Sequence, residues 1–217
     1  MLDETLWRDV VERLQWDAPV HCLRLEPGTT TEEIAEGVAQ AAPDKFVLVG
    51  FSLGGYIARK VAELFPERVA ALVLVATSLE ADSAERAKAK QDAIKALDPA
   101  TFRGLSMGAI AQSLHPERRS DRELVTRIRE MGRRLGYEAM VVQSGLQRDG
   151  IAAETLTCPT LVIAAAQDPL RSEQETEALA AAIPGAALTV IEQSGHMLPL
   201  EQPEALATTL KAWIGTL

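Results

Sequence analysis

One serine in this sequence lies in a setting that would make it a nucleophile. Ser52 is the centre of the run GFSLG at residues 50–54, which fits the pattern G-x-S-x-G. A short apolar run at residues 45–49 precedes it, and residues 56–65 follow with apolar side chains at helical spacing. A sharp strand-to-helix turn strains the backbone at its apex, so the two glycines of the run are expected to give it room. The pattern predicts a nucleophile elbow with Ser52 at its apex.

A serine hydroxyl is a poor nucleophile until a base accepts its proton, and the three histidines are the candidates. His21 lies in an apolar run at residues 20–25 that is typical of a strand, where we expect a structural role. His115 lies in a polar helical stretch and is expected at the surface or in a lid. His196 follows the strand-like residues 187–191, so it would lie on a loop beyond the carboxyl end of a strand, where α/β sheets bind ligands. His196 is therefore the candidate base.

The base needs an acid that orients it. Residues 158–166 form an apolar run of the buried-strand type, and Asp168 comes just after it. Taken alone, an aspartate at this place would be a turn residue or a helix N-cap. Asp149, Glu80 and Asp82 are rival acids, but none of them directly follows a convincing strand. Asp168 is therefore the candidate acid.

These motifs together resemble those of the α/β-hydrolase superfamily, in particular its small single-domain esterase-like members. The order serine, aspartate, histidine along the chain is the order of the triad in that superfamily. The resemblance also rests on the runs PERV from residue 66, CPT from residue 158, GH from residue 195 and LEQPE from residue 200, and it covers nearly the whole chain. It implies that Ser52 is the nucleophile, His196 the general base and then acid, and Asp168 its orienting acid.

The implied chemistry is hydrolysis of a small-molecule carboxylic ester through an acyl-enzyme, without cofactor or metal. The backbone N–H of Leu53, the residue after the nucleophile, would be one oxyanion donor. The same triad serves lactonases, thioesterases, C–C bond hydrolases, perhydrolases, iminopeptidases and some lyase-type enzymes, so the fold alone does not choose among them. A binding protein of this fold without catalysis is a further alternative.

The sequence departs from the resembled pattern near its N-terminus. Related hydrolases carry a further strand between those that match residues 20–25 and 45–50, and a His-Gly or Pro-Gly loop on it supplies a second oxyanion N–H. Here MLDETLW, residues 1–7, resembles the end of that loop, so Met1 and Leu2 are candidates for the second donor. Unpaired strand edges are costly to bury. We therefore expect either that the flanking strands close up or that a second subunit completes the sheet, as a homodimer.

Apolar runs and helical segments alternate along the chain, which is typical of a mostly parallel sheet flanked by helices. We expect strands near residues 20–25, 45–50, 69–76, 159–166 and 187–192, and helices near 3–15, 31–41, 53–65, 172–183 and 203–214. Between residues 77 and 150 the sequence becomes charged and helical, with no strand. An insertion after the carboxyl end of a strand lies above the ligand crevice. We therefore expect a helical lid over residues 78–150 on an α/β-hydrolase core of residues 1–77 and 151–217.

Composition narrows the class of protein. The chain has 217 residues, of which 47% are hydrophobic, and a formal charge of −9. This length allows one substantial core, and the negative charge disfavours nucleic acid as a partner. No apolar stretch is long enough for a bilayer and the first residues do not read as a signal peptide, so we expect a cytoplasmic protein. Cys22 and Cys158 are expected as free thiols, and no cluster of residues has metal-ligand spacing.

Overall fold

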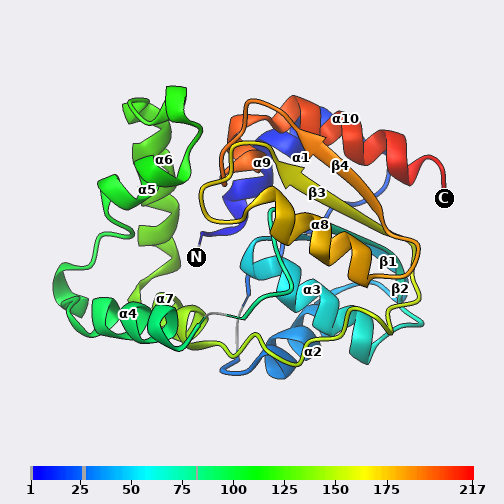
Figure 1. Ribbon diagram of the computed structural model, residues 1–217, viewed down its shortest axis with the longest axis horizontal. Coiled ribbons are helices and arrows are strands. Elements are labelled where there is room, and N and C mark those ends of the chain that lie inside the picture. The colour runs from blue at the N-terminus through cyan, green and yellow to red at the C-terminus, as the bar shows by residue number, and fades with distance from the viewer. Residues whose placement is uncertain (1, 26–27, 82) are drawn as a thin grey trace.

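A four-stranded parallel sheet is the centre of the computed structural model, which describes residues 2–25, 28–81 and 83–217 (Figure 1). The strands are β1 (Phe46–Phe51), β2 (Val69–Val75), β3 (Thr160–Ala165) and β4 (Ala187–Ile191). They lie in the order β1-β2-β3-β4, and each neighbouring pair is parallel. Four of the five strands expected from the sequence are therefore present, each within one residue of its expected ends.

Helices cover both faces of this sheet. The helices outside the segment between β2 and β3 are α1 (Arg8–Leu14), α2 (Thr31–Ala41), α3 (Leu53–Leu64), α8 (Glu173–Ala182), α9 (Leu198–Glu201) and α10 (Pro203–Ile214). Leu72 and Leu74 of β2 pack with α2, α3 and α8, whereas Val73 and Val75 pack with α1 and α10. Because β2 is buried on both faces, its sequence is apolar at every position. Among the described residues, no helix has the length and apolar content that crossing a membrane requires.

The segment between β2 and β3 is helical, as expected, and no strand occurs in its described part. It contains α4 (Ala84–Lys95), α5 (Met107–Ser113), α6 (Arg122–Leu135) and α7 (Tyr137–Gly145), with 3-10 turns at Pro99–Thr101 and Pro116–Arg118. These helices gather on the side toward which β3 points (Figure 1). Ile110, Leu114 and Ile128 form one buried cluster with Met197 and Leu200, so the insertion packs on the loop that follows β4.

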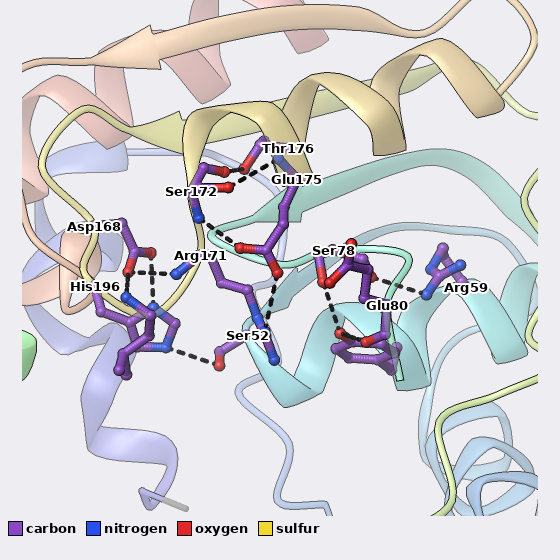
Figure 2. Close-up of polar contacts among 12 residues, drawn as sticks. Ser52, Arg59, Ser78, Glu80, Asp168, Arg171, Ser172, Glu175, Thr176 and His196 are labelled. Atoms are coloured by element: carbon purple, nitrogen blue, oxygen red, sulfur yellow. Dashed lines mark hydrogen bonds and ion pairs between the residues drawn. The ribbon is translucent and has the colours of Figure 1, made fainter. Parts of the chain in front are cut away.

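A buried arginine holds both ends of this helical insertion. Arg59 of α3 is 1% exposed, and its guanidinium donates to the carbonyl oxygens of Ser78 (3.1 Å) and Ile151 (3.2 Å). Burial lowers the pKa of Arg59 to about 10. The Tyr56 hydroxyl lies 3.0 Å from Ser78 Oγ and donates to the carbonyl oxygen of Glu80 (2.7 Å). Figure 2 shows Ser78 and Glu80 next to Arg59. These contacts fix the places where the chain leaves the sheet and returns to it.

The strand expected at residues 20–25 is wrong, because this segment lies outside every helix and strand of the structure. Its residue types favour a strand, but such propensity reflects packing beside a partner strand, and none lies beside it in the described residues. β1 is therefore an edge strand. The flanking segments do not close up either, since a cavity of about 980 Å³ lies along β1 and Leu23 and Leu25 line it.

Candidate active site

Ser52 lies between β1 and α3, at a backbone angle that few residues other than glycine adopt. Its φ is 50° and its ψ is −114°, so the strain expected at the apex of the elbow is confirmed. The Ser52 N–H donates to the carbonyl oxygen of Val75 (2.9 Å), which anchors the turn to β2. Because α3 begins at Leu53, the positive end of the helix dipole lies beside the serine.

The two glycines of the elbow are not equivalent. A Cβ on Gly50 would lie 2.4 Å from the carbonyl oxygen of Gly54, which is closer than any real contact. A Cβ on Gly54 would meet no atom within 4 Å. The second crowded position is Gly55, where a Cβ would lie 2.5 Å from the Thr77 side chain. The expectation that the turn needs a glycine at position 54 as well as at 50 is therefore wrong on steric grounds.

We expect Gly50→Ala to lower the free energy of unfolding by about 1–3 kcal/mol, because the new methyl group overpacks the elbow. Gly54→Ala is the matched control. It should be neutral or stabilising by up to about 1 kcal/mol, since alanine favours a helix and meets no clash here. Urea denaturation of both variants measures the difference. Equal destabilisation by the two substitutions would contradict this account of the elbow.

Asp168 lies in the loop between β3 and α8, and its carboxylate serves two purposes. Oδ1 accepts the backbone N–H groups of Leu170 (2.7 Å) and Arg171 (3.0 Å), as an ordinary turn aspartate would. Oδ2 is thereby left to face His196, at 2.8 Å from Nδ1. The Asp168 side chain is only 1% exposed, so its orientation is fixed by these contacts. One carboxylate thus makes both the contacts of a turn aspartate and the contact with His196.

His196 connects the acid to the serine. Its Nδ1 lies 2.8 Å from Asp168 Oδ2, and its Nε2 lies 2.9 Å from Ser52 Oγ (Figure 2). The histidine side chain is 6% exposed, and its ring packs against Phe51 with centroids 5.2 Å apart. The structure thus brings together the three residues that the sequence singles out. With Nδ1 protonated toward the carboxylate, Nε2 can accept a proton from the serine hydroxyl.

The other sequence candidates lie elsewhere. His21 is exposed in the segment that lines the cavity, and His115 caps the turn Pro116–Arg118. Glu80 and Asp149 are exposed, and Asp82 lies outside the described residues.

Two of the three residues considered for the oxyanion hole are described. Leu53 is buried, and its backbone N–H lies at the start of α3, next to Ser52. Leu2 lines the same cavity as Ser52, and Met1 lies outside the described residues. Both Leu53 and Leu2 stay predictions for the oxyanion donors.

A buried carboxylate supports the loop that carries His196, and the sequence predicts no role for it. Glu201 of α9 is 6% exposed, and its Oε1 accepts the backbone N–H of His115 (2.7 Å). A Cβ on Gly195 would lie 2.3 Å from that same nitrogen, and the His196 N–H donates to the carbonyl oxygen of Ser113 (2.8 Å). Glu201 thus holds the insertion against the loop of His196. Two signals in the sequence pointed to it: Glu201 belongs to the run LEQPE, and it lies five positions after the histidine.

Burial raises the pKa of Glu201 and outweighs the His115 N–H, which lowers it. The folded state then binds this proton more tightly than the unfolded state. Stability should therefore fall as the pH rises from the ordinary glutamate pKa of about 4.3 through the raised value. We expect Glu201→Gln to remove this part of the slope in urea unfolding between pH 4 and 8. An unchanged slope in Glu201→Gln would contradict the raised pKa.

The loss of the Glu201 side chain should also affect turnover. Glu201→Ala should lower kcat by up to about 10²-fold, because the loop that carries His196 loses its support.

Ser52 lines the cavity of about 980 Å³, and most of the lining of this cavity is apolar. Leu105 of the insertion, Leu170 and Met197 line it, together with His196. Other apolar residues of the insertion have a different use, since Leu114 and Met131 are buried where the insertion packs on the core. Arg171, for which the sequence predicts no role, also lines the cavity. Its Nη1 lies 3.3 Å from Glu175 Oε1. In the described part of the chain, no three His, Cys, Asp or Glu side chains gather so as to hold a metal ion, and both cysteines are free thiols.

Comparison with known proteins finds hydrolases that share the fold of this chain. Residues 7–209 match the model of the alpha/beta hydrolase family. A thermophilic esterase from Thermogutta terrifontis, solved with malate bound, is 26% identical and superposes with a TM-score of 0.80, covering 99% of this chain and 86% of the esterase. A hydrolase from Pseudomonas aeruginosa PA01 is 23% identical, with a TM-score of 0.83 and coverage of 99% and 86%. An enol-lactonase from Burkholderia xenovorans LB400 is 18% identical, with a TM-score of 0.80 and coverage of 99% and 87%.

Proposed function

Because this chain belongs to the alpha/beta hydrolase family, we propose that it is a carboxylesterase-type serine hydrolase with Ser52, His196 and Asp168 as its catalytic triad. The observation that carries the proposal is the pair of contacts of one imidazole, 2.9 Å to Ser52 Oγ and 2.8 Å to Asp168 Oδ2. A strained serine between a strand and a helix, at the wall of an apolar cavity, supports it further.

The proposed reaction has two steps. Ser52 Oγ attacks the ester carbonyl while His196 Nε2 takes its proton, and the oxyanion forms next to the backbone N–H of Leu53. His196 then returns the proton to the leaving alcohol, which leaves an acyl group on Ser52. Water, activated by the same nitrogen, hydrolyses this acyl-enzyme. Asp168 keeps the proton of the imidazole on Nδ1 and stabilises the imidazolium that forms in each step.

Lactone hydrolysis is the second candidate, because an enol-lactonase and an esterase superpose on this chain equally well, with TM-scores of 0.80. A lactone is a cyclic ester, so the same attack applies to it. Thioesters and C–C bonds next to a carbonyl are further substrates open to this triad.

A substrate panel tests the proposal. The wild-type protein should hydrolyse p-nitrophenyl esters, with a preference among acyl lengths set by the cavity, and Ser52→Ala should not. Lactones, thioesters and aminoacyl arylamides form the other arms. Labelling by a fluorophosphonate in the wild type, absent in Ser52→Ala, separates an enzyme from a binding protein of this fold. A protein that neither turns over any arm nor takes the label would refute the proposal.

The remaining predictions from the sequence belong with this proposal: a cytoplasmic location, no nucleic-acid partner, a homodimer and a lid function for residues 78–150. Light scattering after size exclusion tests the dimer.

Deletion of the insertion tests the lid only if the core still folds, so a substitution is preferable. Leu105→Trp narrows the cavity from the insertion side and should shift the preference toward shorter acyl groups.

A further inference from the structure

Arg171 is a charged residue in the wall of the cavity that Ser52 lines. Asp168 Oδ1 accepts its backbone N–H (3.0 Å), so the loop that carries the proposed catalytic acid also carries this arginine. Both Arg171 and Ser52 line the cavity of about 980 Å³. Figure 2 shows the guanidinium end of Arg171 on one side of Ser52 and His196 on the other. The cavity therefore has a positive charge on the side of the serine away from the histidine.

The guanidinium of Arg171 has donors that the protein does not use. Its side chain is only 10% exposed, and a buried charge needs partners. Its one ion-pair partner in the described residues is Glu175, whose other carboxylate oxygen accepts the Ser172 N–H (2.7 Å). This pair uses Nη1 alone, whereas Nε and Nη2 of Arg171 donate to no described residue. Nε and Nη2 share one edge of the planar group, and such an edge binds a carboxylate through two parallel hydrogen bonds.

The other charged residues of the cavity are compatible with an anion. The Arg148 guanidinium lies 5.5 Å from the centroid of the Tyr56 ring and also lines the cavity. Tyr56 follows Ser52 by four positions, which places both residues on the same face of α3. The acids in the described lining are Asp3 and Glu4, and each of them pairs with an arginine. An entering anion thus meets no unpaired carboxylate in the described part of the wall.

We propose that Arg171 selects an ester whose acyl part carries a second, free carboxylate, and that Nε and Nη2 bind this carboxylate. This inference rests on the proposed hydrolase function. The leaving alcohol receives its proton from His196 Nε2, so it lies toward the histidine, and the acyl part extends toward Arg171 on the other side of Ser52. Charge-assisted hydrogen bonds are stronger in a mostly apolar cavity than in water. Monoesters of dicarboxylic acids are therefore the expected substrate class.

A series of monomethyl esters tests the proposal. The acids run from succinic to suberic, and each ester is paired with the neutral compound in which a primary amide replaces the free carboxylate. At the best chain length, the kcat/KM of the wild type should be about 10- to 100-fold higher for the acid, mainly through KM. Equal kcat/KM for acid and amide at every length would overturn the proposal. Turnover of the amides would in that case still support the hydrolase assignment.

Two substitutions of the arginine assign the preference to this residue. Arg171→Gln should reduce the acid-to-amide ratio of kcat/KM to near 1, and Arg171→Lys should retain part of it, because lysine keeps the charge without the planar fork. The ratio is taken within one protein, so a general loss of activity cancels. Arg122→Gln, at an exposed position of α6, is the control and should keep the wild-type ratio. A wild-type ratio in Arg171→Gln would show that Arg171 only pairs with Glu175, which would overturn the proposal.

Calorimetry on Ser52→Ala makes the test independent of turnover. This variant should bind the intact monoester about 10-fold or more tightly than the corresponding amide, and addition of Arg171→Gln should remove the difference. If the wild type hydrolyses no ester, the hydrolase assignment fails, and these affinities still decide whether Arg171 binds a carboxylate. Equal affinities of Ser52→Ala for the acid and the amide would overturn the proposal.

Discussion

Replacement of Ser52 by alanine is expected to lower kcat for ester hydrolysis by on the order of 10⁴- to 10⁶-fold, close to background. In the proposed reaction, the hydroxyl oxygen that lies 2.9 Å from His196 Nε2 is the attacking atom, and alanine has no atom to replace it. His196→Ala should cost about as much, and the double variant should be scarcely worse, because the residues of a triad act as a unit. Steady-state kinetics with a p-nitrophenyl ester measure all three.

Two controls separate lost chemistry from lost structure. Ser120→Ala removes an exposed hydroxyl of the insertion and should leave kcat unchanged. Ser52→Ala should unfold at nearly the wild-type urea concentration, since alanine inherits the same backbone strain. A purified His196→Ala protein with wild-type turnover would refute the assignment of the base.

Asp168→Asn is the second large effect, with an expected loss in kcat on the order of 10⁴-fold. The asparagine side chain has one acceptor oxygen, whereas the aspartate carboxylate has two. In the wild type, the Leu170 and Arg171 N–H groups both donate to Oδ1, so the amide oxygen is expected to take that place. The amide NH₂ group would then face His196 Nδ1 and favour the tautomer with the proton on Nε2. That tautomer cannot accept the proton of Ser52, although every residue keeps its place.

Kinetics and structure together test the asparagine variant. Its KM and its unfolding midpoint should stay near those of the wild type, whereas Asp168→Ala should also lose stability because the loop loses its acceptor. Turnover of Asp168→Asn within about 10-fold of the wild type would show that the carboxylate does not set the tautomer.

The strands β1 to β4 could be predicted because each is an apolar run with polar or turn residues beside it. The segment at residues 20–25 shows the limit of that reasoning. A strand forms only where two segments of backbone pair through hydrogen bonds. The sequence of one segment does not show whether another segment lies beside it.

That Ser52, Asp168 and His196 lie together could be predicted, because each of them follows a strand and parallel strands bring their carboxyl ends to one edge of the sheet. Arg59 and Glu201 could not be predicted in this way. Their roles depend on burial and on partners far along the chain, such as Ile151 for Arg59. Both residues lie in helices, where a charged side chain is usually solvated, so nothing in their sequence context predicts that they are buried.

The position of the helical insertion bears on how the chain folds during synthesis. β2 pairs with β3 through Leu72 and Thr160, and the whole insertion separates these two residues along the chain. On the ribosome, β1 and β2 can pair early, but the second edge of β2 stays open until β3 emerges many seconds later. Closing so long a loop slows folding, and an open apolar strand invites association with other chains. The insertion that packs on the loop of His196 thus leaves the second edge of β2 in need of protection in the nascent chain until β3 arrives.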